Sequence, residues 1–152
     1  MPVGSRITRC SSSPSSLHPG MGVPIRILLV EDNDVYRASL ELLLGMQDGL
    51  EVVGGVSDGA AAAAACTTLR AAVVLMDLRL PGLDGPAATA AVLAACPEVA
   101  VLCLTAEATD EDAEAMTVAG AVGLARKGGP VDELVGTIRR VAGRRVVGGG
   151  GA

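Results

Sequence analysis

The sequence predicts an α/β fold of the doubly wound type, in which a five-stranded parallel sheet is covered by helices on both faces. Five short apolar runs alternate along the chain with five segments whose apolar residues recur at helical spacing. The apolar runs are continuous and do not alternate with polar residues, as expected for strands that are buried on both faces. The chain of 152 residues has room for one such domain.

The strands are predicted at apolar runs that contain Val, Leu, Ile and Ala. The whole chain has no Phe or Trp and a single Tyr, Tyr36. A core without large aromatic side chains must be assembled from aliphatic ones. In chain order the predicted strands span residues 25–30, 50–56, 71–77, 99–105 and 121–125.

The helices are predicted between these strands from their periodicity and their end signals. Asp58 is a suitable N-cap for the second helix, and Pro86 suits the first turn of the third. The fourth helix begins with acidic residues, which the helix dipole favours, and Gly120 closes it. Pro130 precedes the last helix. The predicted helices span residues 35–47, 58–69, 85–96, 110–120 and 131–142.

The predicted domain covers residues 25–142, with a flexible N-terminal extension at 1–24 and a disordered Gly-rich tail at 143–152. The extension lacks the apolar core of a secretory signal, and no apolar run reaches transmembrane length. We therefore expect a cytoplasmic protein without membrane contact. The four cysteines show no CxxC spacing, which argues against a zinc site. The net charge of −5 argues against nucleic acid as a general partner.

Polar side chains gather at the predicted carboxyl ends of the strands, where open α/β sheets bind their ligands. Glu31 and Asp32 follow the first strand, and Asp77 ends the third. Thr105 ends the fourth strand, and Lys127, the one lysine, follows the fifth. In a sheet of order 2-1-3-4-5 these groups converge. Clustered carboxylates favour a hard cation such as Mg²⁺, and an ammonium with a hydroxyl suits the oxygens of a tetrahedral anion.

Four segments together resemble the receiver domain of two-component response regulators. They are "LLVEDN", "VLMDLRLPGLDG", "LCLTAE" and "GAVGLARKG", and the similarity runs from about Ile25 to Ala142. The stretches "RILLVEDNDVYRASLELLL", "LEVVGGVSDG" and "IRRVAG" are similar to the subgroup that usually carries a LuxR-type helix-turn-helix output domain. The resemblance implies a (βα)5 flavodoxin-like fold, and no DNA-binding domain is expected in this sequence.

The resemblance also implies a phosphoacceptor and a metal site. Asp77 would accept a phosphoryl group from a sensor histidine kinase. Asp32 and Asp77 would bind Mg²⁺ together with the backbone carbonyl of Arg79, and Glu31 would act directly or through water. The same comparison implies self-phosphorylation and self-dephosphorylation but no turnover of other substrates.

Further residues would assist the phosphoryl group and transmit its effect. Lys127 would pair with a phosphoryl oxygen, and Thr105 would turn its hydroxyl inward beside the amide of Ala106. Arg79 and Glu107 occupy positions expected to influence the phosphoryl lifetime. Homodimer formation is a further expectation from the resemblance.

Other interpretations compete with a phosphorylated receiver. Members of the family commonly have Tyr or Phe at the place of Leu124, so this chain could be a phosphorylation-independent interaction module. An aspartyl-phosphate hydrolase would need an acid two residues after Asp77, where the chain has Arg79. Glu31 and Asp32 could simply cap the first helix. Dinucleotide binding is disfavoured because no GxGxxG follows the first strand.

Overall fold

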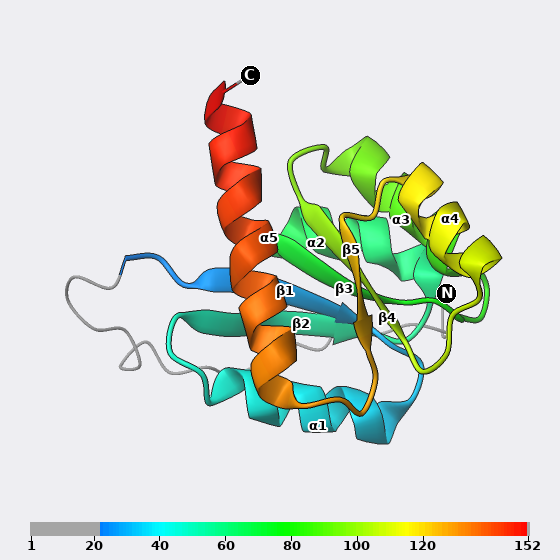
Figure 1. The fold of residues 1–152 in the computed structure, drawn as a ribbon, viewed down its shortest axis with the longest axis horizontal. Coiled ribbons are helices and arrows are strands. Elements are labelled where there is room, and N and C mark those ends of the chain that lie inside the picture. Colours follow the sequence, from blue (N-terminus) through cyan, green and yellow to red (C-terminus); the bar gives the residue numbers. More distant parts are fainter. Residues whose placement is uncertain (1–21, 152) are drawn as a thin grey trace.

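The computed structural model describes residues 22–151, with side chains described to Gly143, and contains a five-stranded parallel sheet (Figure 1). Most of the predicted extension at 1–24 therefore lies outside the described residues. The strand order is β2-β1-β3-β4-β5, which confirms the predicted order and the doubly wound class. The strands are β1 (Ile25–Val30), β2 (Leu50–Val56), β3 (Val73–Asp77), β4 (Ala100–Thr105) and β5 (Gly123–Arg126).

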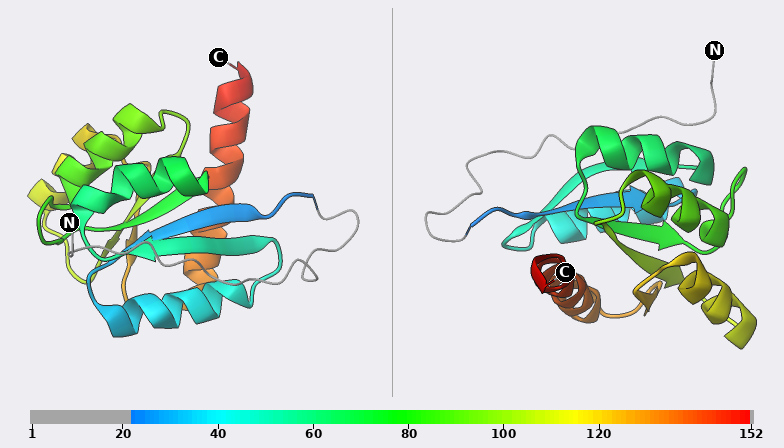
Figure 2. Two further views of the ribbon diagram at one scale, coloured as in Figure 1. Left: turned by 180° about the vertical axis from the view of Figure 1, so that it is seen from behind. Right: turned by 90° about the horizontal axis from the view of Figure 1, so that it is seen from above.

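Helices cover both faces of this sheet, with α1 and α5 on one face and α2, α3 and α4 on the other (Figures 1 and 2). Successive residues of a strand point to opposite faces, so each central strand supplies both layers. In β1, Leu28 and Val30 pack beneath α2 and α3, whereas Ile27 and Leu29 pack beneath α1 and α5. This two-sided burial explains why the strands are continuously apolar in sequence. The helical elements are α1 (Asp34–Gly45), η2 (Gly59–Ala61), α2 (Ala62–Leu69), α3 (Gly85–Ala95), α4 (Asp110–Ala119) and α5 (Val131–Gly151).

The helix starts follow from side chains that accept backbone N–H groups. Asp58 accepts from the amide of Ala61, as the sequence predicts, although the first turn is a 3-10 helix. Asp84 caps α3 and Pro86 lies in its first turn. At α4, Thr109 and Asp112 form a reciprocal capping box. These caps determine where the loops that follow β2, β3 and β4 end and the next helices begin.

The last helix differs from the prediction. The sequence predicts that it ends at Ala142 and that a disordered tail follows, whereas α5 continues to Gly151. No proline interrupts residues 131–151, and the arginines at 144 and 145 are good helix formers, so the residues after Ala142 are compatible with a longer helix. None of the helices in the described part of the chain is long and apolar enough to span a membrane.

Candidate metal and anion site at the carboxyl edge of the sheet

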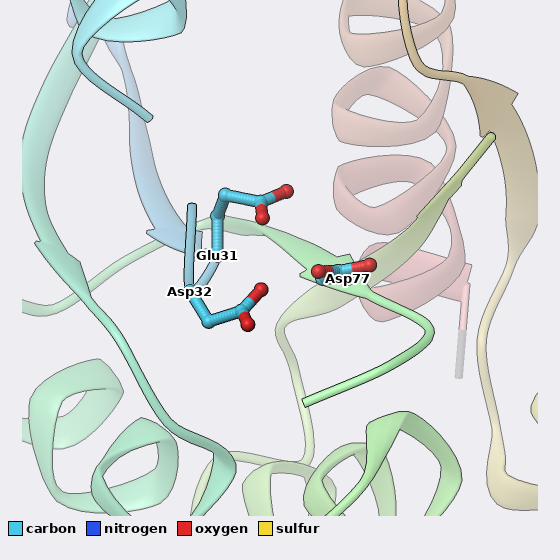
Figure 3. Close-up of side chains that lie close together, drawn as sticks. All are labelled: Glu31, Asp32 and Asp77. Atoms are coloured by element: carbon cyan, nitrogen blue, oxygen red, sulfur yellow. The ribbon is translucent and has the colours of Figure 1, made fainter. Parts of the chain in front are cut away.

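Three carboxylates meet where β1 and β3 end (Figure 3). Glu31 and Asp32 follow β1, and Asp77 is the last residue of β3. One oxygen from each of the three lies within 4.8 Å of the others. Glu31 and Asp77 are buried, whereas Asp32 is exposed. The structure therefore brings together the acidic residues that the sequence analysis selected, in a cluster that opens to solvent through Asp32.

The strand register explains this meeting. Val30 lies opposite Met76 in the parallel pair of β1 and β3, so the next residues, Glu31 and Asp77, emerge at the same level. The amide of Glu31 donates to the carbonyl of Val56 on β2, which holds the end of β1 in the sheet. A shift of register would separate the two buried carboxylates.

Lys127 supplies the positive charge of the cluster. Its Nζ lies 2.7 Å from Oε1 of Glu31 and 3.1 Å from Oδ2 of Asp77. Its backbone amide donates to the carbonyl of Thr105 at 2.9 Å, which ties the loop after β5 to the end of β4. Burial lowers the pKa of Lys127, but its close interactions with the carboxylates of Glu31 and Asp77 outweigh this effect and raise it. The ammonium therefore stays charged beside the carboxylates at neutral pH.

Glu31 has the most constrained environment of the three acids. Its Oε2 accepts the amide of Asn33 at 3.0 Å, and its Oε1 makes the ion pair with Lys127 without an aligned hydrogen bond. Burial raises the pKa of Glu31 despite the neighbouring ammonium. The side chain that caps α1 is Asn33, whose Oδ1 accepts from the amide of Tyr36. Capping of the first helix by the acidic pair, one of the alternatives above, is therefore not observed.

Arg37 and Gly55 support the backbone of Glu31 from behind. Nη1 of Arg37 donates to the Glu31 carbonyl at 2.6 Å, and its Nη2 pairs with Asp34 at 2.7 Å. Gly55 on β2 provides the space for this side chain, because a β-carbon there would lie 2.9 Å from Cδ of Arg37. The position of Glu31 thus depends on a strand that contributes no ligand.

The loop after Asp77 approaches the site through its backbone. The amide of Arg79 lies 3.3 Å from Oδ1 of Asp77 and donates to it. A β-carbon at Gly85 would lie 2.6 Å from the carbonyl oxygen of Leu78, so the close approach of α3 to this loop requires glycine. The guanidinium of Arg79 points to α4, where it pairs with Oδ2 of Asp112 at 3.1 Å. The sequence analysis did not identify this link.

Thr105 lies at the end of β4, and Leu124 lies on the neighbouring edge strand β5. Thr105 ends β4 with a buried side chain, whose Oγ1 accepts the amide of Glu107 at 3.1 Å. Leu124 lies opposite Cys103 in the pairing of β4 and β5, and 44% of its surface is exposed. Position 124 therefore presents an aliphatic side chain to the surface.

Tyr36 is a neighbour of the site that the sequence analysis did not assign. It lies in the first turn of α1, and the centroid of its ring is 5.3 Å from Nζ of Lys127. Burial raises the pKa of its phenol, so the side chain is neutral near pH 7. Its position in the sequence, four residues after Asp32 and so about one helical turn away, could have indicated that it lies near the site.

The residues of the cluster fit a hard divalent cation. Three carboxylates face one ammonium, which leaves negative charge that a cation would neutralise. Oε1 of Glu31 is buried without an aligned hydrogen bond, so it retains capacity as a ligand. Oxygen donors in this number are the ligands that Mg²⁺ prefers.

Comparison with known proteins gives a match over nearly the whole described domain. A family model described as the response regulator receiver domain matches residues 27–139. The response regulator GacA of Pseudomonas protegens is 36% identical over 124 residues, and UvrY of Escherichia coli is 35% identical. The alignments cover 81% of this chain but only 58% and 57% of those proteins. The chain thus spans less than two thirds of the length of these relatives.

Two solved structures add to this likeness. A two-component response regulator of the LuxR family from Aurantimonas has a TM-score of 0.75 and 29% identity, covering 80% of this chain and 87% of that one. The receiver domain of a sensor histidine kinase from Pseudomonas aeruginosa has a TM-score of 0.69 and 34% identity, covering 80% and 99%. That structure holds a magnesium ion coordinated in its active-site cleft.

Proposed function

Since this chain belongs to the response regulator receiver family and so to two-component signalling, we propose that it accepts a phosphoryl group on Asp77 from a sensor histidine kinase. The observation that carries the proposal is the meeting of Asp77 with two further carboxylates and the ammonium of Lys127. Buried carboxylates are costly unless a cation or a proton compensates them, and such sites are commonly functional. The proposal places the protein in the cytoplasm.

Magnesium would be held by three carboxylates that already lie close together and by one backbone carbonyl. Asp32 and Asp77 would provide carboxylate oxygens and Arg79 its backbone carbonyl, while Glu31 would bind directly or through water. When bound, the ion would neutralise charge on the phosphoryl oxygens and on the carboxylates. The magnesium ion in the Pseudomonas aeruginosa receiver domain supports this assignment.

The residues of the chain have separate tasks in the transfer. An oxygen of Asp77 attacks phosphorus in line with the leaving group, a P–O bond forms, and the P–N bond to the kinase histidine breaks with its electron pair on nitrogen. Lys127 lies 3.1 Å from that carboxylate and would exchange this contact for a phosphoryl oxygen. Positioning and charge neutralisation account for most of the catalysis in such transfers.

The effect of phosphorylation would pass through the loop after β4. Thr105 would turn its hydroxyl to a phosphoryl oxygen beside the amide of Ala106, which requires the bond from the amide of Glu107 to Oγ1 to be released. This loop leads directly into α4. The expected outcome is a shift between two conformations of this side of the domain, to be read by a partner or by a second copy of the chain.

The test is phosphorylation by a small donor. The intact protein with acetyl phosphate and Mg²⁺ should gain one acid-stable, base-labile phosphoryl group by mass spectrometry, and Asp77→Asn should abolish it. Asp84→Asn is the matched control, because it makes the same change in the adjacent loop and asparagine remains a good N-cap for α3. Equal labelling of the Asp77→Asn variant would remove Asp77 from this role.

A phosphorylation-independent interaction module is the second candidate, favoured by the aliphatic side chain of Leu124 at the surface of β5. It predicts a folded wild-type protein that gains no phosphoryl group under the same conditions. We also propose that the protein does not turn over external phosphate esters, since Arg79 stands where a hydrolase would need an acid. Release of p-nitrophenol from its phosphate ester would contradict this.

A further inference from the structure

Tyr36 lies beside the site but is none of the proposed ligands. It lies in the first turn of α1, on the face that packs against the core beneath α1 and α5. Its amide is fixed by Asn33, so the start of the helix determines where the ring points. Tyr36 is also the one aromatic residue of the 152-residue chain. The core contains aliphatic side chains, and the single aromatic ring lies next to the acidic cluster.

Two contacts join this ring to consecutive residues after β5. The ring centroid lies 5.3 Å from Nζ of Lys127, within the range of an attraction between a cation and an aromatic face. The backbone N–H of Gly128 partly offsets the rise in the pKa of the Tyr36 phenol, so the phenol lies beside this residue. Gly128 has a φ of +77°, so the loop turns sharply directly after the lysine. Tyr36 therefore contacts both the tip of the lysine and the backbone that carries it.

The chemistry of the ring suits a lysine that must change partners. Lys127 is bound to Glu31 and Asp77 at 2.7 and 3.1 Å, and the proposed function requires it to move to a phosphoryl oxygen. A carboxylate in place of the ring would add a further charge that resists this movement. A neutral ring attracts the ammonium through its quadrupole and adds no formal charge, so it limits the directions open to the lysine without holding it in place.

We propose that Tyr36 is a positioning residue for Lys127, with its ring directing the ammonium toward Asp77. The inference rests on the proposed function only for the role of the lysine in phosphoryl transfer. The contact itself is a property of the folded chain. The two can therefore be tested separately.

Nuclear magnetic resonance tests the contact directly, because the chain has one lysine and one tyrosine. In protein labelled with ¹³C-lysine, the Hε protons of Lys127 should be shifted upfield by the ring current and should show an NOE to the Tyr36 ring. Tyr36→Phe should keep the shift, and Tyr36→Leu should abolish it. Lys127 Hε protons at the position of a free lysine in the wild type would overturn the proposal.

The rate of phosphorylation by acetyl phosphate with Mg²⁺ tests the consequence. Tyr36→Leu keeps an apolar side chain but removes the ring, and it should slow phosphorylation roughly three- to tenfold, whereas Tyr36→Phe should stay within about twofold. Val35→Ala, at a neighbouring exposed position of α1, is the control that should leave the rate unchanged. Equal rates for the wild type and Tyr36→Leu would overturn the proposal. A wild type that is not labelled would overturn the proposed function, and the contact would still be decided by the lysine resonance.

Discussion

Two ion-paired groups lie at and beside Asp77: the interior pair, in which Lys127 meets Glu31 and Asp77, and the surface pair of Arg79 and Asp112. Their distances are similar, but their exposure to solvent differs. Lys127 lies 2.7 Å from Glu31 and 3.1 Å from Asp77, while Arg79 lies 3.1 Å from Asp112. The side chains of Glu31 and Asp77 are 1% and 5% exposed, whereas that of Arg79 is 75% exposed. Solvent screens the second pair and hardly reaches the first. Burial, more than distance, therefore separates the interior pair from the surface pair.

The carboxylates of the two pairs also differ in the direction of their pKa shifts. Burial raises the pKa of Glu31, because the charged form loses water. The backbone N–H of Thr109 lowers the pKa of Asp112, because it donates to the charged form. As the pH falls, Glu31 therefore takes up its proton at a higher pH than an ordinary glutamate, and Asp112 takes up its proton at a lower pH than an ordinary aspartate. The predictions below test whether this contrast governs stability and signalling.

The largest effect is expected when the interior pair loses its cation. Lys127→Met should lower the free energy of unfolding by roughly 3 kcal/mol at neutral pH, because two buried carboxylates lose their partner. Urea denaturation measures the loss. Arg126→Met removes the same charge from the preceding, exposed residue and should have little effect. A loss below about 1 kcal/mol for Lys127→Met would show that solvent screens this pair as well.

A smaller effect is expected in the pH dependence of stability. Because the pKa of Glu31 is raised in the folded state, the folded protein binds more protons than the unfolded chain between the ordinary value of 4.5 and the raised one. The contribution of Glu31 to stability should therefore fall as the pH rises through this window.

Glu31→Gln tests this dependence when both proteins are unfolded with urea in the presence of EDTA between about pH 4.5 and 7. The difference in stability between the wild type and the variant isolates the contribution of Glu31. It should favour the wild type less as the pH increases. A difference that grows in the opposite direction would mean that Lys127 outweighs burial.

The smallest effect on stability is expected at the surface pair. Arg79→Ala should change the urea midpoint by no more than the error of the measurement, because its guanidinium is mostly hydrated. The variant should still be phosphorylated, but the lifetime of the phosphoryl group should change, since residue 79 lies beside the site. An unchanged decay of the label would exclude any influence of the Arg79 side chain.

The fold and the position of the acidic cluster could be predicted because they follow from local patterns and one topological rule. Continuous apolar runs located the strands, and the carboxyl ends of parallel strands share one edge of the sheet. Once the order 2-1-3-4-5 is assumed, Asp77 and Lys127 must approach each other. The structure confirms that order and brings the two within 3.1 Å.

The remaining features depend on the directions of side chains, which the spacing of residues does not encode. The link from Arg79 to Asp112 spans 33 residues and depends on where the first turn of α4 lies relative to the loop after β3. The contact between Tyr36 and Lys127 likewise needs the angle at which α1 leaves β1. The structure extends α5 to Gly151, beyond the predicted end at Ala142, because a Gly-rich composition indicates a tail but does not exclude a helix.

The space at Gly55 has a consequence for how variation in this protein should be interpreted. A methyl group there would displace Arg37, and Arg37 carries the carbonyl of a buried acid at 2.6 Å. A saturation screen for signalling-deficient variants should therefore return position 55, on a strand that contributes nothing to the chemistry, together with the acidic and basic residues themselves. Such a hit would belong to the same functional unit, although β2 and the strand that precedes the lysine, β5, form opposite edges of the sheet.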